Sequence, residues 1–599
     1  MRSWFAFLAA GAIVLGCGSP KSSGFNGFGG GGGQAASGGN GGAGGNVGAT
    51  GCTKDPDCDA CKGCYALCIC TTGSPKVQCE SACGLPTGGS GGSSSGGSAS
   101  GGSSGSGSGG TSVGGNGGSS SGGSGGQPAT KGALAGGVSI SQIVINQGVA
   151  IAIEKNGQAV SNRNAPVVQG RQALMRVFVS PGGGFSSRTI VGRLSATGEK
   201  DQTLSKSVSG TSSQSNLGST FNFTIPAAQM TGSMKFSVEL EEASGSTKGT
   251  ANGARYPGSG TANMSAQSAH GPFKVVVVPA VMNGHAPNTN QAHMTALKNA
   301  LMEMYPATGI TMTLHGAVNY PYGSVSANGS GWSQALQWAM GLRNQLGVDS
   351  RTFIYSMLAP ASSMQSFCGG GCVAGLGSVP PASDVSGRAS VGLGYFPDGS
   401  GGPSKYSGGA PMTMAHELGH ALGRNHANCS QGGSISGVDP NYPYQNGSIG
   451  VWGYDLIGKQ LENPSQYKDF MGYCSPGWVS DYTYSGIFSR ESYVNANGYV
   501  VESPDPLRAP GRFRVAIIEP DGTMHWTATE TTTQPMFGEE RAVQVLDKAG
   551  NVVGTVVGFF RPVADLAGGI LYVRDSAVSV QSGVHAISAR KLSPTVLAL

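Results

Sequence analysis

One eleven-residue string restricts this chain more than any other part of its sequence: from His416 to His426 it reads His-Glu-Leu-Gly-His-Ala-Leu-Gly-Arg-Asn-His. His416 and His420 share one face of a helix, where both can bind one metal ion. Gly423 permits the backbone conformation that ends a helix, and the resulting turn brings His426 toward the same point. Three neutral imidazoles leave a fourth position open for water, as a catalytic rather than a structural zinc site requires.

An acid stands directly after the first histidine of this string. Glu417 is near the ligand face, where it can act as general base toward a water molecule activated by the metal. The pattern H-E-x-x-H alone arises by chance on ordinary helices, but the glycine and the third histidine at their offsets argue against coincidence. The string therefore predicts one Zn²⁺ bound by His416, His420 and His426, with Glu417 as the catalytic residue.

The complete pattern H-E-x-x-H-x-x-G-x-x-H resembles the zinc site of the metzincin metallopeptidases. The resemblance covers roughly residues 271–490 and implies an α/β (α+β) catalytic domain that hydrolyses peptide bonds. The wider segments 439–444 and 477–482 look like those of large bacterial surface metallopeptidases, including the mucin-cleaving lipoprotein group. Ala427 and Asn428 do not match the residues that mark astacins, serralysins, adamalysins or matrixins, so the subfamily stays open.

Metzincins also carry a methionine-containing turn beneath the metal. Met471, in the segment Asp-Phe-Met-Gly-Tyr-Cys, matches that turn. In astacins and serralysins a tyrosine two residues later binds the metal or donates a hydrogen bond in the transition state. Tyr473 has this place, and the alternative is that it is only a packing aromatic. Cys429 and Cys474 follow the two segments and are candidates for a disulfide that joins them.

The first residues have the features of an export signal. Arg2 gives a positive start, Phe5 to Leu15 forms a short apolar core, and Val-Leu-Gly-Cys ends it at Cys17. The core is too short for a spanning helix. We expect cleavage before Cys17, which would carry a lipid anchor and hold the protein at a bacterial membrane, on the cell surface or in the periplasm. The alternative is a plain signal peptide.

Composition then divides the chain. There are 104 glycines and only 11% charged residues, and much of the glycine lies in two tracts that cannot form a core. The formal charge of +5 has no basic stripe, which excludes nucleic-acid binding. The sequence predicts a signal peptide (1–16), a Gly-rich linker (17–50), a Cys-rich module (51–84), a Gly/Ser linker (85–130), a β-sandwich-like domain (131–270), the metzincin-like domain (271–490) and a C-terminal β-domain (491–599).

The Cys-rich module contains eight cysteines: Cys52, Cys58, Cys61, Cys64, Cys68, Cys70, Cys79 and Cys83. An even number in a short exported stretch favours disulfides. The spacing of the second to fifth also matches a ferredoxin cluster, but Ile69 stands where that pattern has proline.

Periodicity predicts the elements around the zinc string. Strands are expected at 273–279, 310–314 and 352–357, and helices at 290–304 and 332–346. The segment 389–395 has two interpretations, an edge strand that accepts an extended peptide or an ordinary strand. Short alternating runs in 138–271 and after residue 491 predict the flanking β-domains, and the latter contains no catalytic motif.

These features together predict a multidomain zinc endopeptidase that acts on extracellular proteins or glycoproteins. The alternatives are an adhesin or glycan-binding protein with a non-catalytic zinc fold, and a zinc amidase acting on cell-wall peptides. Structural Ca²⁺ occurs in such folds, but no acidic loop in this sequence supports it.

Overall fold

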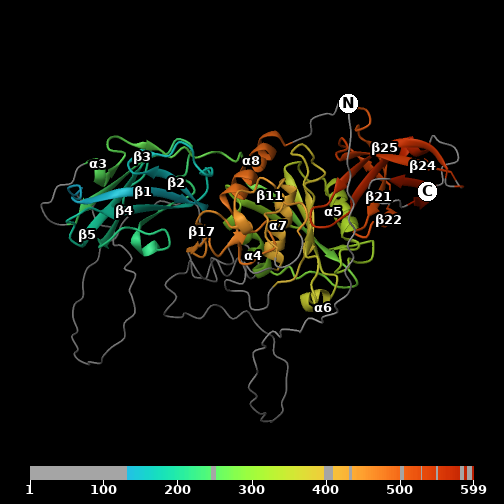
Figure 1. The fold of residues 1–599 in the computed structure, drawn as a ribbon, viewed down its shortest axis with the longest axis horizontal. Coiled ribbons are helices and arrows are strands. Elements are labelled where there is room, and N and C mark those ends of the chain that lie inside the picture. Colours follow the sequence, from blue (N-terminus) through green and yellow to red (C-terminus); the bar gives the residue numbers. More distant parts are fainter. Residues whose placement is uncertain are drawn as a thin grey trace, which may run out of the picture. The chain divides into compact units, whose positions relative to one another are not determined.

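The computed structural model describes residues 131–243, 251–396, 409–430, 435–498, 505–527, 529–547, 549, 551–579, 586–589 and 596–598. The predictions for the signal peptide, Cys17, both glycine-rich linkers and the Cys-rich module lie outside these residues. The described part is a mixed α+β structure, rich in antiparallel sheets and with few helices (Figure 1).

Two antiparallel sheets form the N-terminal part. The first contains β1 (Val138–Asn146), β2 (Gly148–Lys155), β3 (Gln158–Ala159), β4 (Ala173–Pro181), β7 (Phe221–Ile225), β17 (Gly453–Asp455) and β18 (Gln460–Glu462). The second contains β5 (Arg188–Ala196), β6 (Gln202–Val208), β8 (Lys235–Glu242), β9 (Arg255–Tyr256) and β10 (Ala262–Asn263). The alternating runs at 139–145, 173–179, 221–225 and 234–240, among those that predict strands in 138–271, form β1, β4, β7 and β8.

A third, mostly parallel sheet precedes the histidine string in the chain. Its strand order is β12 (Ile310–Leu314), β11 (Phe273–Val281), β14 (Thr352–Leu358), β16 (Ala389–Leu393) and β15 (Gly375–Leu376), with β13 (Val318–Asn319) also paired to β11. The pairs are parallel except for β15 with β16. The interpretation of 389–395 as an edge strand is therefore wrong, because β16 is hydrogen-bonded on both sides and β15 forms the edge.

Helices cover both faces of this sheet, because its strands are apolar on both. Val275 and Val277 of β11 belong to one core with α4 (Gln291–Met304) and α7 (Ala410–Ala421). Val278, the residue after Val277 in β11, belongs to a second core with α5 (Trp332–Leu346). Alternate residues of a strand point to opposite faces, so α7 and α5 lie on opposite sides of the sheet.

The helix predictions at 290–304 and 332–346 are confirmed. Asn290 caps α4, because its side chain accepts a hydrogen bond from the His293 amide at 2.9 Å. Gly347 ends α5 in the left-handed conformation, with φ of 58°. Helix α7 begins with Pro411 in its first turn and ends before Gly423, whose φ is +81°. Gly423 thus has the conformation that the sequence predicts.

A fourth, antiparallel sheet forms the C-terminal part. Its strands are β21 (Gly511–Ile518), β22 (Met524–Trp526), β23 (Glu530–Thr532), β24 (Glu539–Leu546), β25 (Val552–Pro562), β26 (Gly569–Arg574), β27 (Ala586–Ala589) and β28 (Val596–Ala598). The second core continues from α5 into this sheet through Val515, Ile517 and Tyr572. The sheet therefore shares its apolar interior with the part of the chain that contains the histidines.

The remaining elements are short, apart from one helix. They are β19 (Lys468–Asp469), β20 (Gly477–Trp478), α3 (Ala251–Ala254), α6 (Met364–Cys368), α8 (Asp481–Asn497), α9 (Asp575–Ser579) and the 3₁₀ turns at Leu217–Ser219 and Gln445–Gly447. Helix α8 runs across the predicted boundary between residues 490 and 491. Within the described residues, no helix has both the length and the apolar character needed to cross a membrane.

Candidate metal centre

Helix α7 and the turn after it bring three imidazoles to one point. The Nε2 atoms of His416 and His420 are 3.0 Å apart. The Nε2 of His426 lies 3.2 Å from that of His416 and 3.1 Å from that of His420. All three side chains are buried, at 8%, 0% and 0% exposure. The structure therefore brings together the three histidines that the sequence selects as metal ligands.

The opposite ring nitrogen of each histidine faces a backbone carbonyl. Nδ1 of His416 lies 2.7 Å from the Phe470 oxygen, and Nδ1 of His420 lies 2.7 Å from the Arg424 oxygen. Nδ1 of His426 contacts the Ser436 oxygen in the same way. A carbonyl only accepts hydrogen bonds, so each Nδ1 carries the proton and each Nε2 presents its lone pair to the common point. Three converging lone pairs repel one another unless a cation lies between them, so the cluster could hold a metal ion.

His426 reaches this point because a turn and a short strand-like contact direct it. The turn begins at Gly423, where an added Cβ would lie 2.2 Å from the Arg490 guanidinium. The His426 amide then donates to the Gly437 oxygen at 3.0 Å, and the Asp439 amide donates to the His426 oxygen at 2.9 Å. The backbone on both sides of the third histidine is therefore fixed.

Met471 lies beneath the histidine helix, as the resemblance implies. Its side chain is fully buried, and a Cβ added to Gly419 of α7 would lie 2.4 Å from its sulfur. Its carbonyl accepts a hydrogen bond from the Ala427 amide at 3.0 Å. Cys429 and Cys474 form the predicted disulfide, which joins the segment after His426 to the segment after Met471. A second disulfide joins Cys368 and Cys372.

The two wider segments that carry the bacterial surface-peptidase resemblance contact each other. The rings of Tyr442 and Tyr482 meet edge to face at 5.5 Å. The Tyr482 hydroxyl donates to Asp439 at 2.8 Å, and the Tyr444 hydroxyl donates to Asp481 at 2.6 Å. These contacts support the chain on either side of the Met471 turn.

Glu417 lies on the sheet-facing side of α7, next to the edge strand β15. Its side chain is buried, and its Oε2 has no hydrogen-bond partner. A Cβ at Gly375 would lie 2.4 Å from Glu417 Oε1, and one at Gly377 would lie 3.4 Å from Oε2. Gly375 of the edge strand and Gly377 directly after it thus leave room for the carboxyl group.

A fourth donor comes from the C-terminal sheet. Asp565, in the segment between β25 and β26, has Oδ1 at 3.0 Å from His426 Nε2 and 3.4 Å from His416 Nε2. Its Oδ2 lies 3.6 Å from His420 Nε2. One donor atom from each of these four residues lies within 4.8 Å of the others. The group of residues that could hold a metal ion therefore contains a carboxylate beside the three histidines, whereas the sequence predicts the histidines alone.

Tyr473 lies at the same point, where its hydroxyl donates to Asp565 Oδ1 at 2.8 Å. Its ring centroid is 5.0 Å from that of His426 and 5.8 Å from that of His416, and the side chain is 41% exposed. Its polar end therefore faces the histidine cluster.

Burial and mutual charge shift the acids of this site in opposite directions. Burial raises the pKa of Glu417 well above its ordinary value, and the nearby charge of Asp565 raises it further. Burial also disfavours the charged form of Asp565, but the three imidazoles outweigh it and hold the pKa of Asp565 well below its usual range. Burial and the Asp565 carboxylate both raise the pKa of Tyr473, so the phenol keeps its proton.

Sequence reasoning missed Asp565, and no local signal marks it. It stands in Val-Ala-Asp-Leu-Ala-Gly, 139 residues from His426, with no other ligand residue beside it. Only the packing of the C-terminal sheet against α5 and the turn at Gly377 brings it to the cluster.

Comparison with known proteins gives little further information. No protein-family model matches the chain, and no curated protein matches it. A solved chaperone–substrate complex is 13% identical over 46% of this chain and 40% of that chain, with a TM-score of 0.20. A crystal structure of metalloproteinase-II from Bacteroides fragilis is 11% identical over 57% of this chain and 87% of that chain, with a TM-score of 0.21. One weakly similar structure thus bears the name of a metalloproteinase, at a TM-score too low to indicate a common fold.

Proposed function

We propose that this chain is a zinc-dependent endopeptidase of the metzincin type that hydrolyses peptide bonds of extracellular proteins or glycoproteins. The observation that carries the proposal is the convergence of three Nε2 atoms with Glu417 directly beside them. Zn²⁺ bound tetrahedrally at 2.0–2.1 Å from each nitrogen would separate the nitrogens by about 3.3 Å. The separations of 3.0–3.2 Å come close to that value.

The chain's own residues then have distinct roles in hydrolysis. Bound zinc supplies Lewis acidity, which polarises the substrate carbonyl and lowers the pKa of water. Glu417 takes the proton of the attacking water as the new C–O bond forms, and it delivers a proton to the leaving amine as the C–N bond breaks. The Tyr473 hydroxyl, already directed at the cluster, donates to the oxyanion that develops on the substrate.

Replacing the base tests this mechanism. We expect Glu417→Gln to lower the rate of casein cleavage by about 100-fold or more, because a general base contributes that much. Zinc content should stay at one ion per chain, since Glu417 is not among the four residues that could hold the metal. The full chain is assayed with and without a chelator, in the natural sequence and in an Asp565→Ala background that removes the fourth donor.

Glu199→Gln is the matched control, because Glu199 is an exposed glutamate in the turn between β5 and β6. This control should digest casein at the unaltered rate. Undiminished digestion by Glu417→Gln would rule out the mechanism.

A second candidate, a surface adhesin or glycan-binding protein with a structural zinc site, is favoured by Asp565. Structural zinc sites have four protein ligands, and here a fourth protein donor is in place. This candidate predicts chelator-insensitive binding to a mucin-type glycoprotein without fragments, in both the natural chain and Asp565→Ala. A zinc amidase acting on cell-wall peptides would use the same chemistry, and a panel of peptide substrates separates it.

We also propose that the protein is exported and anchored through a lipid on Cys17. The support is the Val-Leu-Gly-Cys sequence after a short apolar core. The disulfides Cys368–Cys372 and Cys429–Cys474 agree with an oxidising compartment.

A further inference from the structure

The C-terminal sheet supplies Asp565 to the histidine cluster, and a working metallohydrolase could not keep this carboxylate bound to its metal. Asp565 approaches all three histidines, and its side chain is only 8% exposed, so it is part of the cluster rather than a surface carboxylate. If Asp565 binds together with the three histidines, the protein supplies all four ligands of a tetrahedral metal ion. A catalytic zinc site keeps one position for water or substrate.

We propose that Asp565 is a fourth metal ligand that keeps the enzyme latent, and that activity requires residues 564–568 to withdraw from the metal. This inference rests on the proposed function. It concerns regulation of that same site by the C-terminal sheet.

Two hydrogen bonds hold the segment against the site from either side. The Ala564 amide donates to the Gly377 oxygen at 2.9 Å. The Ala564 oxygen accepts from Ser436 Oγ at 3.0 Å. Ser436 is also the residue whose carbonyl holds His426 Nδ1, so the segment is fixed to the backbone that positions the third histidine.

The segment also covers the place where a peptide substrate would lie. Gly377 directly follows β15, the edge strand of the parallel sheet, and both Gly377 and Gly375 of β15 lie next to Glu417. An extended peptide adds to a sheet edge through backbone hydrogen bonds, and Ala564 already uses the Gly377 carbonyl. Withdrawal would therefore free both the fourth metal position and this edge.

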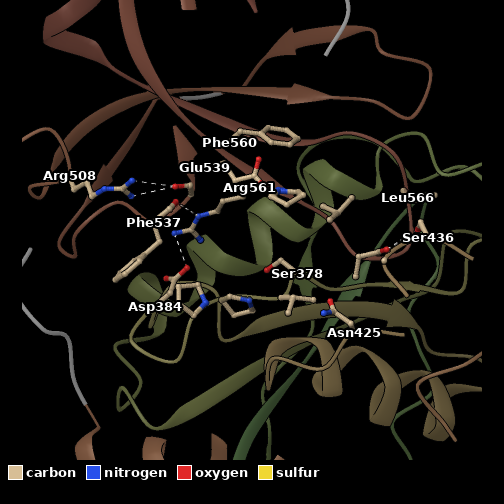
Figure 2. Close-up of a pocket in the computed structure, with 18 residues that line it drawn as sticks. Ser378, Asp384, Asn425, Ser436, Arg508, Phe537, Glu539, Phe560, Arg561 and Leu566 are labelled. Atoms are coloured by element: carbon tan, nitrogen blue, oxygen red, sulfur yellow. Dashed lines mark hydrogen bonds and ion pairs between the residues drawn. The ribbon is translucent and has the colours of Figure 1, made fainter. Parts of the chain in front are cut away.

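A cavity behind the segment provides space for that movement. It measures about 630 Å³ and is lined by Pro562, Val563, Ala564 and Leu566, but not by Asp565, which points the other way toward the histidines. Figure 2 shows Leu566 and Ser436 at one end of this cavity and Arg508 at the other, with Arg561 and Asp384 between them. At the end of the segment, Gly568 and Gly569 have φ of +97° and +150°. Glycine tolerates such values and changes conformation at low cost.

The remainder of the C-terminal sheet has further contacts of its own with the rest of the molecule. Arg561 forms a buried ion pair with Asp384 at 3.1 Å and donates to Ser386 Oγ at 2.7 Å. Phe513, Val515 and Ile570 belong to the core that contains α5. Val563 is buried in that same core and Leu566 packs against it, so withdrawal of Asp565 would begin at Ala564 and would separate Leu566 from the core while the sheet stays in place.

The test uses the full chain loaded with Co²⁺, whose visible spectrum reports the number and type of ligands. Acetohydroxamate is the probe, since it binds a metal that has an open position. We expect it to leave the spectrum of the natural protein unchanged and to shift the spectra of Asp565→Ala and Asp565→Asn. Chelator competition should show metal binding at least about tenfold weaker in Asp565→Ala. Loss of a mere hydrogen-bond partner of a metal ligand already lowers metal affinity by about 10–100-fold.

Activity provides the second measurement. Casein cleavage by the zinc-loaded Asp565→Ala and Asp565→Asn chains should exceed that of the natural chain by about tenfold or more, because removing a competing closed state raises the competent fraction. Ser436→Ala, which removes one anchor and no donor, should give a smaller rise. Asp521→Asn, the same change in an exposed turn of the same sheet, should behave as the natural chain does. Thermal unfolding monitored by circular dichroism shows that each variant is folded.

The outcomes separate the two proposals. If acetohydroxamate shifts the spectrum of the natural protein as readily as that of Asp565→Ala, Asp565 is not a ligand and the inference is wrong. If the Asp565 variants open the metal but no variant cleaves any substrate, the inference stands and the proposed peptidase function fails. If the natural chain cleaves as fast as Asp565→Ala, the protein is not latent.

Discussion

The geometry at the three histidines depends on residues that never touch a metal. The carbonyls of Phe470, Arg424 and Ser436 hold the Nδ1 atoms. Such partners fix the tautomer and the orientation of each ring. Gly419 also supports the histidines without binding a metal. Because it has no side chain, Met471 can lie against α7 at this position.

Tyr473 offers a test at the scale of one atom. In the Asp565→Ala background, we expect Tyr473→Phe to lower kcat by about 100-fold, as loss of an oxyanion donor does, with little change in KM. Initial rates over a range of concentrations of a fluorogenic peptide give both constants. Tyr322→Phe, an exposed phenol at 37% exposure, is the control and should be without effect. A rise in KM with kcat unchanged would show that Tyr473 binds substrate without acting in the transition state.

At this scale, the sequence predicts the residues whose spacing is set by one helix and one turn. His416, His420 and Gly423 follow from helical periodicity and backbone conformation. Asp565 could not be predicted, because its position depends on how a distant sheet packs. Tyr473 lies between these cases, since the resemblance placed it near the metal but only the structure pairs it with Asp565.

Among the helices and strands around the site, some are predicted by the sequence and some are not. Periodicity predicts α5 and the alternating strands before α7, because each buries apolar side chains on a face set by its own sequence. It does not predict that β16 is flanked on both sides. Its edge partner β15 has only two residues, Gly375 and Leu376, which is too short for any pattern.

The disulfide between Cys429 and Cys474 connects two loops that no helix or strand joins. Closing a loop with a sequence separation of 45 reduces the entropy of the unfolded chain. The chain-entropy model puts the stabilisation at about 4 kcal/mol for this loop and about 2 kcal/mol for a five-residue loop. We expect the double variant Cys429→Ser, Cys474→Ser to unfold at a lower temperature in calorimetry at a fixed zinc concentration.

The matched control is Cys368→Ser with Cys372→Ser, which opens a loop with a sequence separation of 4. It should lower the unfolding temperature by a smaller amount. Equal shifts for the two double variants would contradict the prediction, as would an unchanged midpoint for the first.

On the scale of the whole molecule, the described sheets do not follow the boundaries that composition predicts. Strands β17 and β18 come after the histidine string in sequence but complete the first antiparallel sheet by pairing with β2. The C-terminal sheet shares a core with α5 and donates Asp565 to the histidines. Composition detects linkers and core-forming stretches, but it carries no information on which stretches share an interior.

The proposed anchoring at Cys17 is tested on the full chain expressed in a bacterium. We expect Cys17→Ala to abolish labelling by radioactive palmitate and to shift the protein from the membrane fraction to the soluble fraction, because the apolar core before it is too short to span the bilayer. Cys52→Ala is the control and should leave both unchanged. Membrane retention of Cys17→Ala would instead support another mode of attachment.

The indole of Trp478 donates to the Gly148 carbonyl at 2.7 Å, across 330 residues of sequence. In β20, Trp478 also pairs with Asp469 of β19, which lies two residues before Met471. Contacts of such long sequence separation form late and slowly. Because the chain is synthesised from its N-terminus, β1 and β2 therefore remain in an incomplete sheet until nearly the last fifth of the polypeptide has been made. The segment that contains Met471 cannot pack beneath the histidine site before then, so an unfinished chain lacks the arrangement of three histidines that could hold a metal ion.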